Sequence, residues 1–294
     1  MDYHIWQRLA VFGYLAAVAL SVAVMLFGRE INGSKRWLAL GPFSFQPSEF
    51  AKVALILFLA DLVTKNVKTI GKMWTLCRIM FWILPIVGLV GASNLSTAII
   101  ILGIGVILIF VASPKYAQFA LMGIAGACFM GIFLALESYR LERLAIWRNP
   151  EKYEKGYQTL QGLYAIGSGG VFGVGIGNSV QKLGFVPEAQ NDMIFSIICE
   201  ELGLAGAGII VFLFLLLIWR FFLIASGSRD LFGALIATGA MAHMMIQVIL
   251  NIAVVTNTIP NTGITLPFIS YGGTSVMFLL IEMGLVLSVS QVVD

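Results

Sequence analysis

Long apolar runs separated by short charged segments are the feature that most limits how this chain can fold. Eight runs approach the ~20 residues that an α-helix needs to cross a bilayer. They cover approximately Leu9–Phe27, Phe50–Val63, Leu76–Gly91, Leu95–Ala112, Tyr116–Leu136, Met193–Trp219, Leu231–Val255 and Ser275–Val292. Pro85 and the glycines between Gly203 and Gly208 predict kinks. We therefore expect an all-α, polytopic transmembrane helix bundle with about eight spans.

Composition excludes the main alternatives to a membrane protein. Of the 294 residues 59% are hydrophobic and only 11% are charged, too few to cover a soluble surface. The net charge of +3 comes without a basic stripe, so no nucleic-acid partner is expected. Cys77, Cys128 and Cys199 lie inside apolar runs without metal-ligand spacing, which predicts packing residues and no metal site.

The positions of the basic residues predict the orientation of the chain. Short cytoplasmic loops are enriched in lysine and arginine. Such residues gather in three loops, at Lys65, Lys68 and Lys72, at Lys115, and at Arg220 and Arg229. With eight spans, both termini then lie in the cytoplasm. Residues 1–294 are expected to form a single transmembrane domain, with external loops at approximately 28–48, 137–191 and 256–274.

The longest external segment carries basic and aromatic side chains followed by glycines. The basic and aromatic residues are Arg140, Arg143, Trp147, Arg148, Lys152, Tyr153, Lys155, Tyr157 and Lys182. Such a set suits a ligand with phosphate and sugar groups, but an amphipathic helix on the membrane surface explains it equally well. The glycines between Gly167 and Gly177 permit close backbone approach, and no Gly-Lys-Ser/Thr ending makes them a phosphate-binding loop.

Three carboxylates stand where this external segment enters an apolar run. Asp192 lies at the junction, either as an ordinary helix N-cap or as a functional group. Glu200 and Glu201 lie two turns further into the run. Ionisable groups inside a bilayer are costly and usually face a partner or a water-filled cavity. At least one of the two glutamates should therefore be paired or protonated.

Two other segments combine polar residues with helix-start signals. Residues 32–37 read NGSKRW, and residues 46–52 read QPSEFAK, in which proline, serine and glutamate predict the start of a helix. Glu49 and Lys52 are three residues apart and can pair on one face, as an anchor of the span or as part of a site.

The last external loop and the run before it are also unusual. Two prolines and three glycines between Asn257 and Thr274 predict a broken, re-entrant segment that lines a cavity. His243, Gln247 and Asn251 recur every four residues, which favours helix–helix hydrogen bonding over a proton path.

Taken together, these segments resemble the SEDS family of bacterial cell-wall polymerases, the FtsW, RodA and SpoVE group. The matching stretches are NGSKRW at 32–37, QPSEFAK at 46–52, AIGSGGVFGVGIGNSVQK at 165–182, PEAQNDMIFSIICEELGLAG at 187–206 and PNTGITLPFISYGGTS at 260–275. The five matches stand in the right order and are spread over nearly the whole chain. Members of the family typically have about ten spans, and Leu9–Phe27 is similar to the third, so the first two are expected to be missing here.

The resemblance implies a peptidoglycan glycosyltransferase that polymerises lipid II, the undecaprenyl-diphosphate-linked disaccharide-pentapeptide, in the bacterial plasma membrane. It implies a class B penicillin-binding protein as partner, and a role in cell shape, elongation, division or sporulation. Transfer from a diphosphate-linked sugar needs one base and cations around the leaving group.

The resemblance makes Asp192 the base of this reaction. Arg36, Lys52 and Lys182 are candidates for neutralising the diphosphate, alone or with a divalent cation such as Mg²⁺. Gln46, Glu49, Ser270 and Tyr271 are further substrate-binding candidates, and Glu200 and Glu201 are expected to support the helix that carries Asp192.

Two other functions stay open at this point. A lipid II flippase would use the intramembrane Glu200 and Glu201 and the broken last loop as a conduit, and would respond to the proton gradient. A non-catalytic scaffold for a penicillin-binding protein would tolerate the loss of Asp192 but not of its interface helices.

Overall fold

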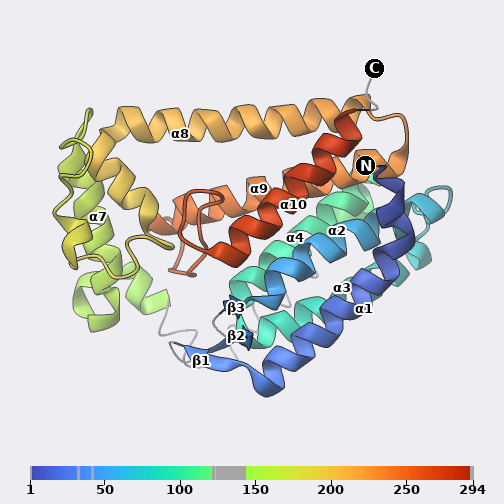
Figure 1. The fold of residues 1–294 in the computed structure, drawn as a ribbon, viewed down its shortest axis with the longest axis horizontal. Coiled ribbons are helices and arrows are strands. Elements are labelled where there is room, and N and C mark those ends of the chain that lie inside the picture. The colour runs from blue at the N-terminus through green and yellow to red at the C-terminus, as the bar shows by residue number, and fades with distance from the viewer. Residues whose placement is uncertain (1, 32–33, 41–42, 121–122, 124–143, 292–294) are drawn as a thin grey trace. The chain divides into compact units, whose positions relative to one another are not determined.

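A computed structural model describes residues 2–31, 34–40, 43–120, 123 and 144–291. The long helices are α1 (His4–Phe27), α2 (Pro47–Asn66), α3 (Met73–Ser93), α4 (Leu95–Ala112), α7 (Tyr157–Gly169), α8 (Ile194–Gly227), α9 (Leu231–Val255) and α10 (Gly273–Ser290) (Figure 1). Short 3₁₀ turns are η1 (Pro150–Lys152), η2 (Glu154–Gly156) and η3 (Gln181–Leu183). The expected all-α class is confirmed.

Six helices in the described part of the chain are long and apolar enough to cross a membrane, namely α1, α3, α4, α8, α9 and α10. Each coincides with one of the eight apolar runs. The run at Phe50–Val63 also forms a helix, α2, but this helix carries Glu49, Lys52, Asp61 and Lys65. The run at Tyr116–Leu136 lies mostly outside the described residues. The chain is a multi-pass membrane protein.

The chain divides into two compact units, and each is described by itself. The first contains Met1–Gln118, Ile218–Ile246 and Gly272–Asp294, and the second contains Phe119–Leu217 and Gln247–Tyr271. Residues 1–294 were expected to form a single domain, and that expectation stays a prediction.

Helix α2 is the core of the first unit. It packs against α1, α3, α4 and α10. Leu55, Leu59 and Ala60 are completely buried, as expected for a helix enclosed by others. The helix begins at Pro47, where the sequence predicts a start, because proline fits the first helical position and Glu49 favours the positive end of the helix dipole.

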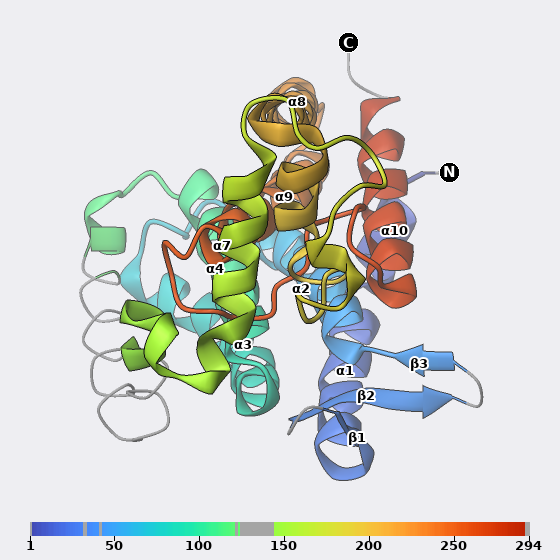
Figure 2. The same cartoon turned by 90° about the vertical axis from the view of Figure 1, so that its left-hand side faces the viewer.

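The loop expected at 28–48 contains a small antiparallel sheet that the sequence did not predict. Strand β2 (Ser34–Leu40) lies between β1 (Arg29–Ile31) and β3 (Phe43–Phe45) (Figure 2). In the register, Leu38 lies opposite Phe45 and Ala39 opposite Ser44. The sheet carries Arg36 and leads directly into α2.

In the second unit, α7 and the first turns of α8 pack through glycines. Gly162 faces Met193, and Gly169 lies so close to the carbonyl of Cys199 that a Cβ atom would sit 1.9 Å from it. Helix α8 is interrupted at Gly203, where φ is +68°. This confirms the kink predicted between Gly203 and Gly208. Helix α3 continues through Pro85.

Candidate active site

Asp192 lies in the turn that precedes α8 and is only 7% exposed. The turn is closed by the backbone N–H groups of Asn191 and Met193, which both donate to the carbonyl of Glu188. Glu188 itself has φ of +56°, an uncommon conformation for a residue other than glycine. Gln158 of α7 donates to Asp192 Oδ1 at 3.5 Å, a long contact. The local backbone thus holds a carboxylate in a buried position at the mouth of a helix.

Ser270 and Tyr271 connect the loop before α10 to this turn by hydrogen bonds. The Ser270 hydroxyl donates to the carbonyl of Asn191 at 2.6 Å and accepts from the N–H of Leu266 at 2.7 Å. The N–H of Tyr271 donates to the carbonyl of Gln190 at 2.8 Å. The Ser270 side chain is buried, whereas the Tyr271 ring is 74% exposed. These two sequence-predicted residues therefore bind backbone carbonyls of the Asp192 turn, Ser270 through its side chain and Tyr271 through its own backbone.

Asn251 of α9 is a positioning residue that the sequence interpretation did not assign to the site. Its Nδ2 atom donates to the carbonyls of Asp192 at 2.8 Å and of Ile264 at 2.7 Å. Gln247, one turn earlier, donates to the carbonyl of Thr265 at 3.0 Å. His243, Gln247 and Asn251 form a polar stripe on α9. Within this unit, Gln247 and Asn251 of the stripe donate hydrogen bonds to backbone carbonyls of the broken loop, which such a segment needs in a membrane. The four-residue spacing was the only sequence signal for this role.

We expect Asn251→Ala to destabilise the Asp192 turn. The substitution leaves two buried carbonyls without this donor, and each such loss costs about 1–3 kcal/mol. Thermal unfolding in detergent should show a clearly lower midpoint for Asn251→Ala than for Asn178→Ala, which removes an exposed side chain that donates to the Val174 carbonyl at 3.2 Å. Equal midpoints for the two variants would argue against this positioning role.

Glu200 and Glu201 bind the segment that follows the glycine cluster, which comprises the glycines between Gly167 and Gly177. Glu200 accepts from the Ser179 hydroxyl and, at 3.1 Å, from the N–H of Val180. Glu201 forms an ion pair with Lys182, whose Nζ lies 2.5 Å from Oε1. The structure therefore gives both glutamates partners, and it places Lys182 beside a carboxylate in the same unit as Asp192.

The glycine cluster lies against the kink of α8. The N–H groups of Val174 and Gly175 donate to the carbonyls of Glu200 and Glu201 at 2.9 and 3.0 Å. At Gly173, where φ is +78°, a Cβ atom would lie 2.1 Å from the Glu201 carbonyl oxygen. Only glycine tolerates both the conformation and the close approach.

Gly173→Ala is therefore expected to push the glycine cluster away from α8. The matched control is Gly177→Ala, which has the same kind of positive φ, +86°, but no heavy atom within 4 Å of the added Cβ. We expect the thermal midpoint in detergent to fall much further for Gly173→Ala than for Gly177→Ala. A similar loss in both would mean that backbone strain, and not the contact with α8, governs this position.

A cavity of about 600 Å³ opens next to the Asp192 turn. Its lining residues are Lys182, Val186, Glu188, Ala189, Gln190, Ile194 and Ile197. The volume lies in the usual range for a ligand site. The cavity offers an ammonium group, a carboxylate and an amide together with apolar side chains, on residues that precede and follow Asp192.

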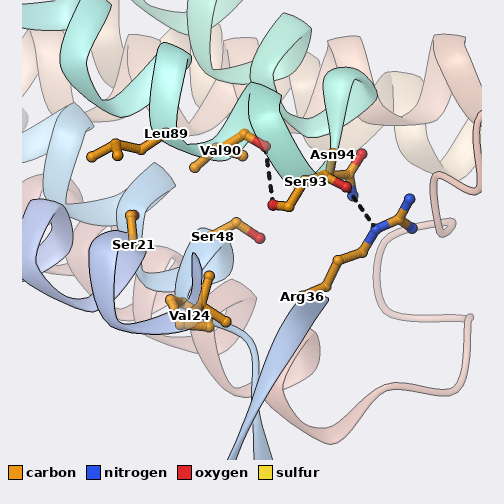
Figure 3. Close-up of a pocket in the computed structure, with 9 residues that line it drawn as sticks. Ser21, Val24, Arg36, Ser48, Leu89, Val90, Ser93 and Asn94 are labelled. Atoms are coloured by element: carbon orange, nitrogen blue, oxygen red, sulfur yellow. Dashed lines mark hydrogen bonds between the residues drawn. The ribbon is translucent and has the colours of Figure 1, made fainter. Parts of the chain in front are cut away.

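The remaining sequence-predicted residues belong to the first unit. Arg36 of β2 donates from Nε to the carbonyl of Ser93 at 3.2 Å, at the junction of α3 and α4 (Figure 3). Beside it lies a cavity of about 10 Å³, room for one water molecule, lined in part by Ser48 and Asn94. Gln46 precedes α2 and donates to the Ser48 hydroxyl at 3.2 Å.

Glu49 and Lys52 form the ion pair expected from their spacing. Lys52 Nζ lies 2.9 Å from Glu49 Oε1, and both side chains are at least nine-tenths buried. A second buried pair joins α9 to α10 in the same unit, where His243 Nδ1 lies 2.8 Å from Glu282 Oε2. His243 thus makes a helix–helix hydrogen bond, as its place in the polar stripe favoured. Glu282 is a buried ionisable group that the sequence interpretation did not single out.

The described residues contain no group of three or more His, Cys, Asp or Glu side chains that could hold a metal ion. Mg²⁺ stays an untested expectation. Arg140 and Arg143 of the external segment lie outside the described residues, as does Cys128.

The apolar helices define a multi-pass membrane protein, and the buried carboxylate of Asp192 gives it an ionisable group where one of these helices begins. A family model described as "Cell cycle protein", that of FtsW, RodA and SpoVE, matches residues 1–294. The chain belongs to this family.

Relatives and solved structures agree with this assignment. The chain is 40% identical to the stage V sporulation protein E of Bacillus subtilis, over 99% of this chain and 81% of that protein. It is 34% identical to a probable peptidoglycan glycosyltransferase FtsW of Trichlorobacter lovleyi, over 99% of this chain and 78% of that protein. A solved structure described as a peptidoglycan synthase complex that coordinates polymerization and crosslinking matches with a TM-score of 0.85 and 30% identity, over 99% of this chain and 83% of that one.

Proposed function

We propose that this chain is a peptidoglycan glycosyltransferase that polymerises lipid II in the bacterial plasma membrane. The chain's family and the glycosyltransferase named among its relatives support this activity. The observation that carries the proposal is Asp192, a buried carboxylate held at the mouth of a membrane helix beside a cavity of about 600 Å³. The basic loops favour an orientation with both termini in the cytoplasm, which puts this mouth on the outer face.

In the proposed reaction Asp192 takes the proton of the acceptor sugar's hydroxyl group. The hydroxyl oxygen then bonds to the anomeric carbon of the donor, and the bond from that carbon to the diphosphate oxygen breaks. Undecaprenyl diphosphate leaves with the bonding electron pair. Because a diphosphate is a good leaving group, one carboxylate is enough, unlike the pair used in glycoside hydrolysis.

Cationic side chains are proposed to stabilise the charge that grows on the leaving diphosphate. Lys182 lies in the unit of Asp192 and lines the cavity next to it. Arg36 and Lys52 lie in the other unit, where Lys52 is buried in its ion pair with Glu49. Arg36 and Lys182 are therefore the candidates that keep part of the side chain exposed. Arginine and lysine suit this role because they bind phosphate oxygens through charge-assisted hydrogen bonds.

The proposed partner is a class B penicillin-binding protein, a transpeptidase that would cross-link the new strands. Support comes from the similarity to a complex whose description joins polymerization with crosslinking. We expect the purified chain to make longer glycan strands when such a partner is added, measured on gels with labelled lipid II.

The experiment that tests the proposed activity separates polymerisation from transport. The purified chain is placed in liposomes that contain labelled lipid II, with and without a proton gradient. A polymerase converts lipid II to glycan in both conditions, whereas a flippase moves lipid II in response to the gradient and leaves it monomeric. Monomeric lipid II throughout, with folded protein and partner present, would refute the proposal. Movement of that lipid II in response to the gradient would then favour a flippase, and no movement would favour a scaffold.

A further inference from the structure

The glycine loop, defined as residues 170–177, consists only of glycines and large apolar residues. It reads GVFGVGIG and has no polar side chain. All four apolar side chains are exposed, Val171 by 57%, Phe172 by 84%, Val174 by 43% and Ile176 by 81%. Loops that face water are usually polar, and contiguous exposed apolar surface marks a site of interaction.

The backbone of the glycine loop is already hydrogen-bonded to α8. In addition to the two bonds from Val174 and Gly175, the carbonyls of Gly170 and Val171 each accept, at 3.0 Å, from an N–H just after the kink of α8. The N–H of Gly173 donates to the carbonyl of Gly169 at 2.8 Å. Non-helical backbone can enter a membrane only where protein or water satisfies its polar groups. The glycine loop meets this condition through α8.

The position of the glycine loop along α8 places it near one membrane boundary. The straight part of α8 after the kink runs from Leu204 to Gly227, which at 1.5 Å per residue is about 36 Å. This part alone crosses the ~30 Å hydrocarbon layer. The loop is bonded to residues 200–205, at the beginning of that part. Leu204, at this boundary, is itself 65% exposed, as expected for a side chain that faces lipid.

We propose that the glycine loop is a membrane anchor that inserts its four apolar side chains into the boundary between headgroups and acyl chains. The ligand is the hydrocarbon of the bilayer. Lipid fits better than a protein partner because the loop offers no polar side chain to a partner and adjoins the exposed side of α8. The polar residues that follow, with the ion pair of Lys182 and Glu201, then lie at headgroup level, where Lys182 keeps one third of its side chain exposed. Glycines with positive φ at positions 170, 173, 175 and 177 let the backbone of the loop approach the helix closely.

The test measures depth in the bilayer, so it is independent of the proposed enzymatic function. The full chain, with its three native cysteines replaced by alanine, receives a single cysteine as Phe172→Cys or Ile176→Cys. Two controls are Glu151→Cys, at an exposed polar site of the same unit, and Leu213→Cys, at an exposed apolar site of α8. Each cysteine carries a nitroxide in phosphatidylcholine–phosphatidylglycerol nanodiscs. Collision with oxygen and with a water-soluble nickel complex is measured by electron paramagnetic resonance.

We expect the oxygen-to-nickel collision ratio at positions 172 and 176 to exceed that of Glu151→Cys several-fold and to stay below that of Leu213→Cys, which lies ~14 Å further along α8 and therefore deeper in the bilayer. A ratio equal to that of Glu151→Cys would place the loop in water and overturn the proposal. Low collision with both reagents would mean that protein covers the loop, which also overturns it. Size-exclusion profiles like that of the parent chain confirm that each labelled variant is folded.

Discussion

Asp192→Asn is expected to slow glycan polymerisation by about 10²–10⁴-fold, the usual contribution of a positioned general base. Asparagine has nearly the shape of aspartate but cannot accept the proton of the acceptor hydroxyl. The carbonyl of residue 192 keeps its bond from Asn251, because that contact involves the backbone. The variant should therefore fold and insert normally. Initial rates of lipid II consumption by equal amounts of purified protein measure the effect.

Glu151→Gln is the control for this prediction. It removes the same charge from an exposed side chain of the same unit that does not line the cavity. Because Glu151 is assigned neither to proton transfer nor to the cavity, the variant should retain a rate within a few-fold of that of the parent. If Glu151→Gln loses as much activity as Asp192→Asn, the effect is one of net charge, and the assignment of the base fails.

Lys52→Met is expected to lower the free energy of unfolding by about 3–5 kcal/mol. The Glu49 carboxylate is buried with Lys52, and Oε2 of Glu49 has no hydrogen-bond partner within the described residues. Removing the ammonium group leaves a negative charge in a place from which water is excluded. Such an uncompensated charge costs far more than the pair contributes.

The double variant Glu49→Gln, Lys52→Met is the control for the ion pair. With both charges removed the uncompensated carboxylate disappears, so most of the lost stability should return. Thermal unfolding in detergent of the two single variants and the double variant completes a double-mutant cycle. Additive losses in the double variant would contradict a direct electrostatic coupling between Glu49 and Lys52.

The helices could be predicted from the sequence because they depend on local patterns. Apolar runs of sufficient length, proline at the start of α2 and glycine at the kink of α8 each act through nearby backbone. The pair of Glu49 and Lys52 is likewise local, since residues three apart on a helix are neighbours. The sheet at 29–45 was missed because its strands are short and become stable only by pairing.

The contacts that shape the site could not be predicted, because they join residues far apart in the chain. Asn251 reaches the carbonyl of Asp192 across 59 positions, and His243 meets Glu282 across 39. Periodicity identifies which face of a helix is polar but not which carbonyl or carboxylate that face meets. The glycine loop is a further example. Its composition indicates that its backbone approaches another segment closely, but only the structure identifies that segment as α8.

Asp192 is proposed to be the base with which this chain itself forms glycosidic bonds. The most direct test resolves the products of labelled lipid II on a gel, with the parent chain and Asp192→Asn in parallel, each with the penicillin-binding partner. We predict a ladder of long glycan strands from the parent chain and only lipid II from Asp192→Asn. Equal ladders from both proteins would contradict the role of Asp192, and the absence of product from the folded parent chain would contradict the activity.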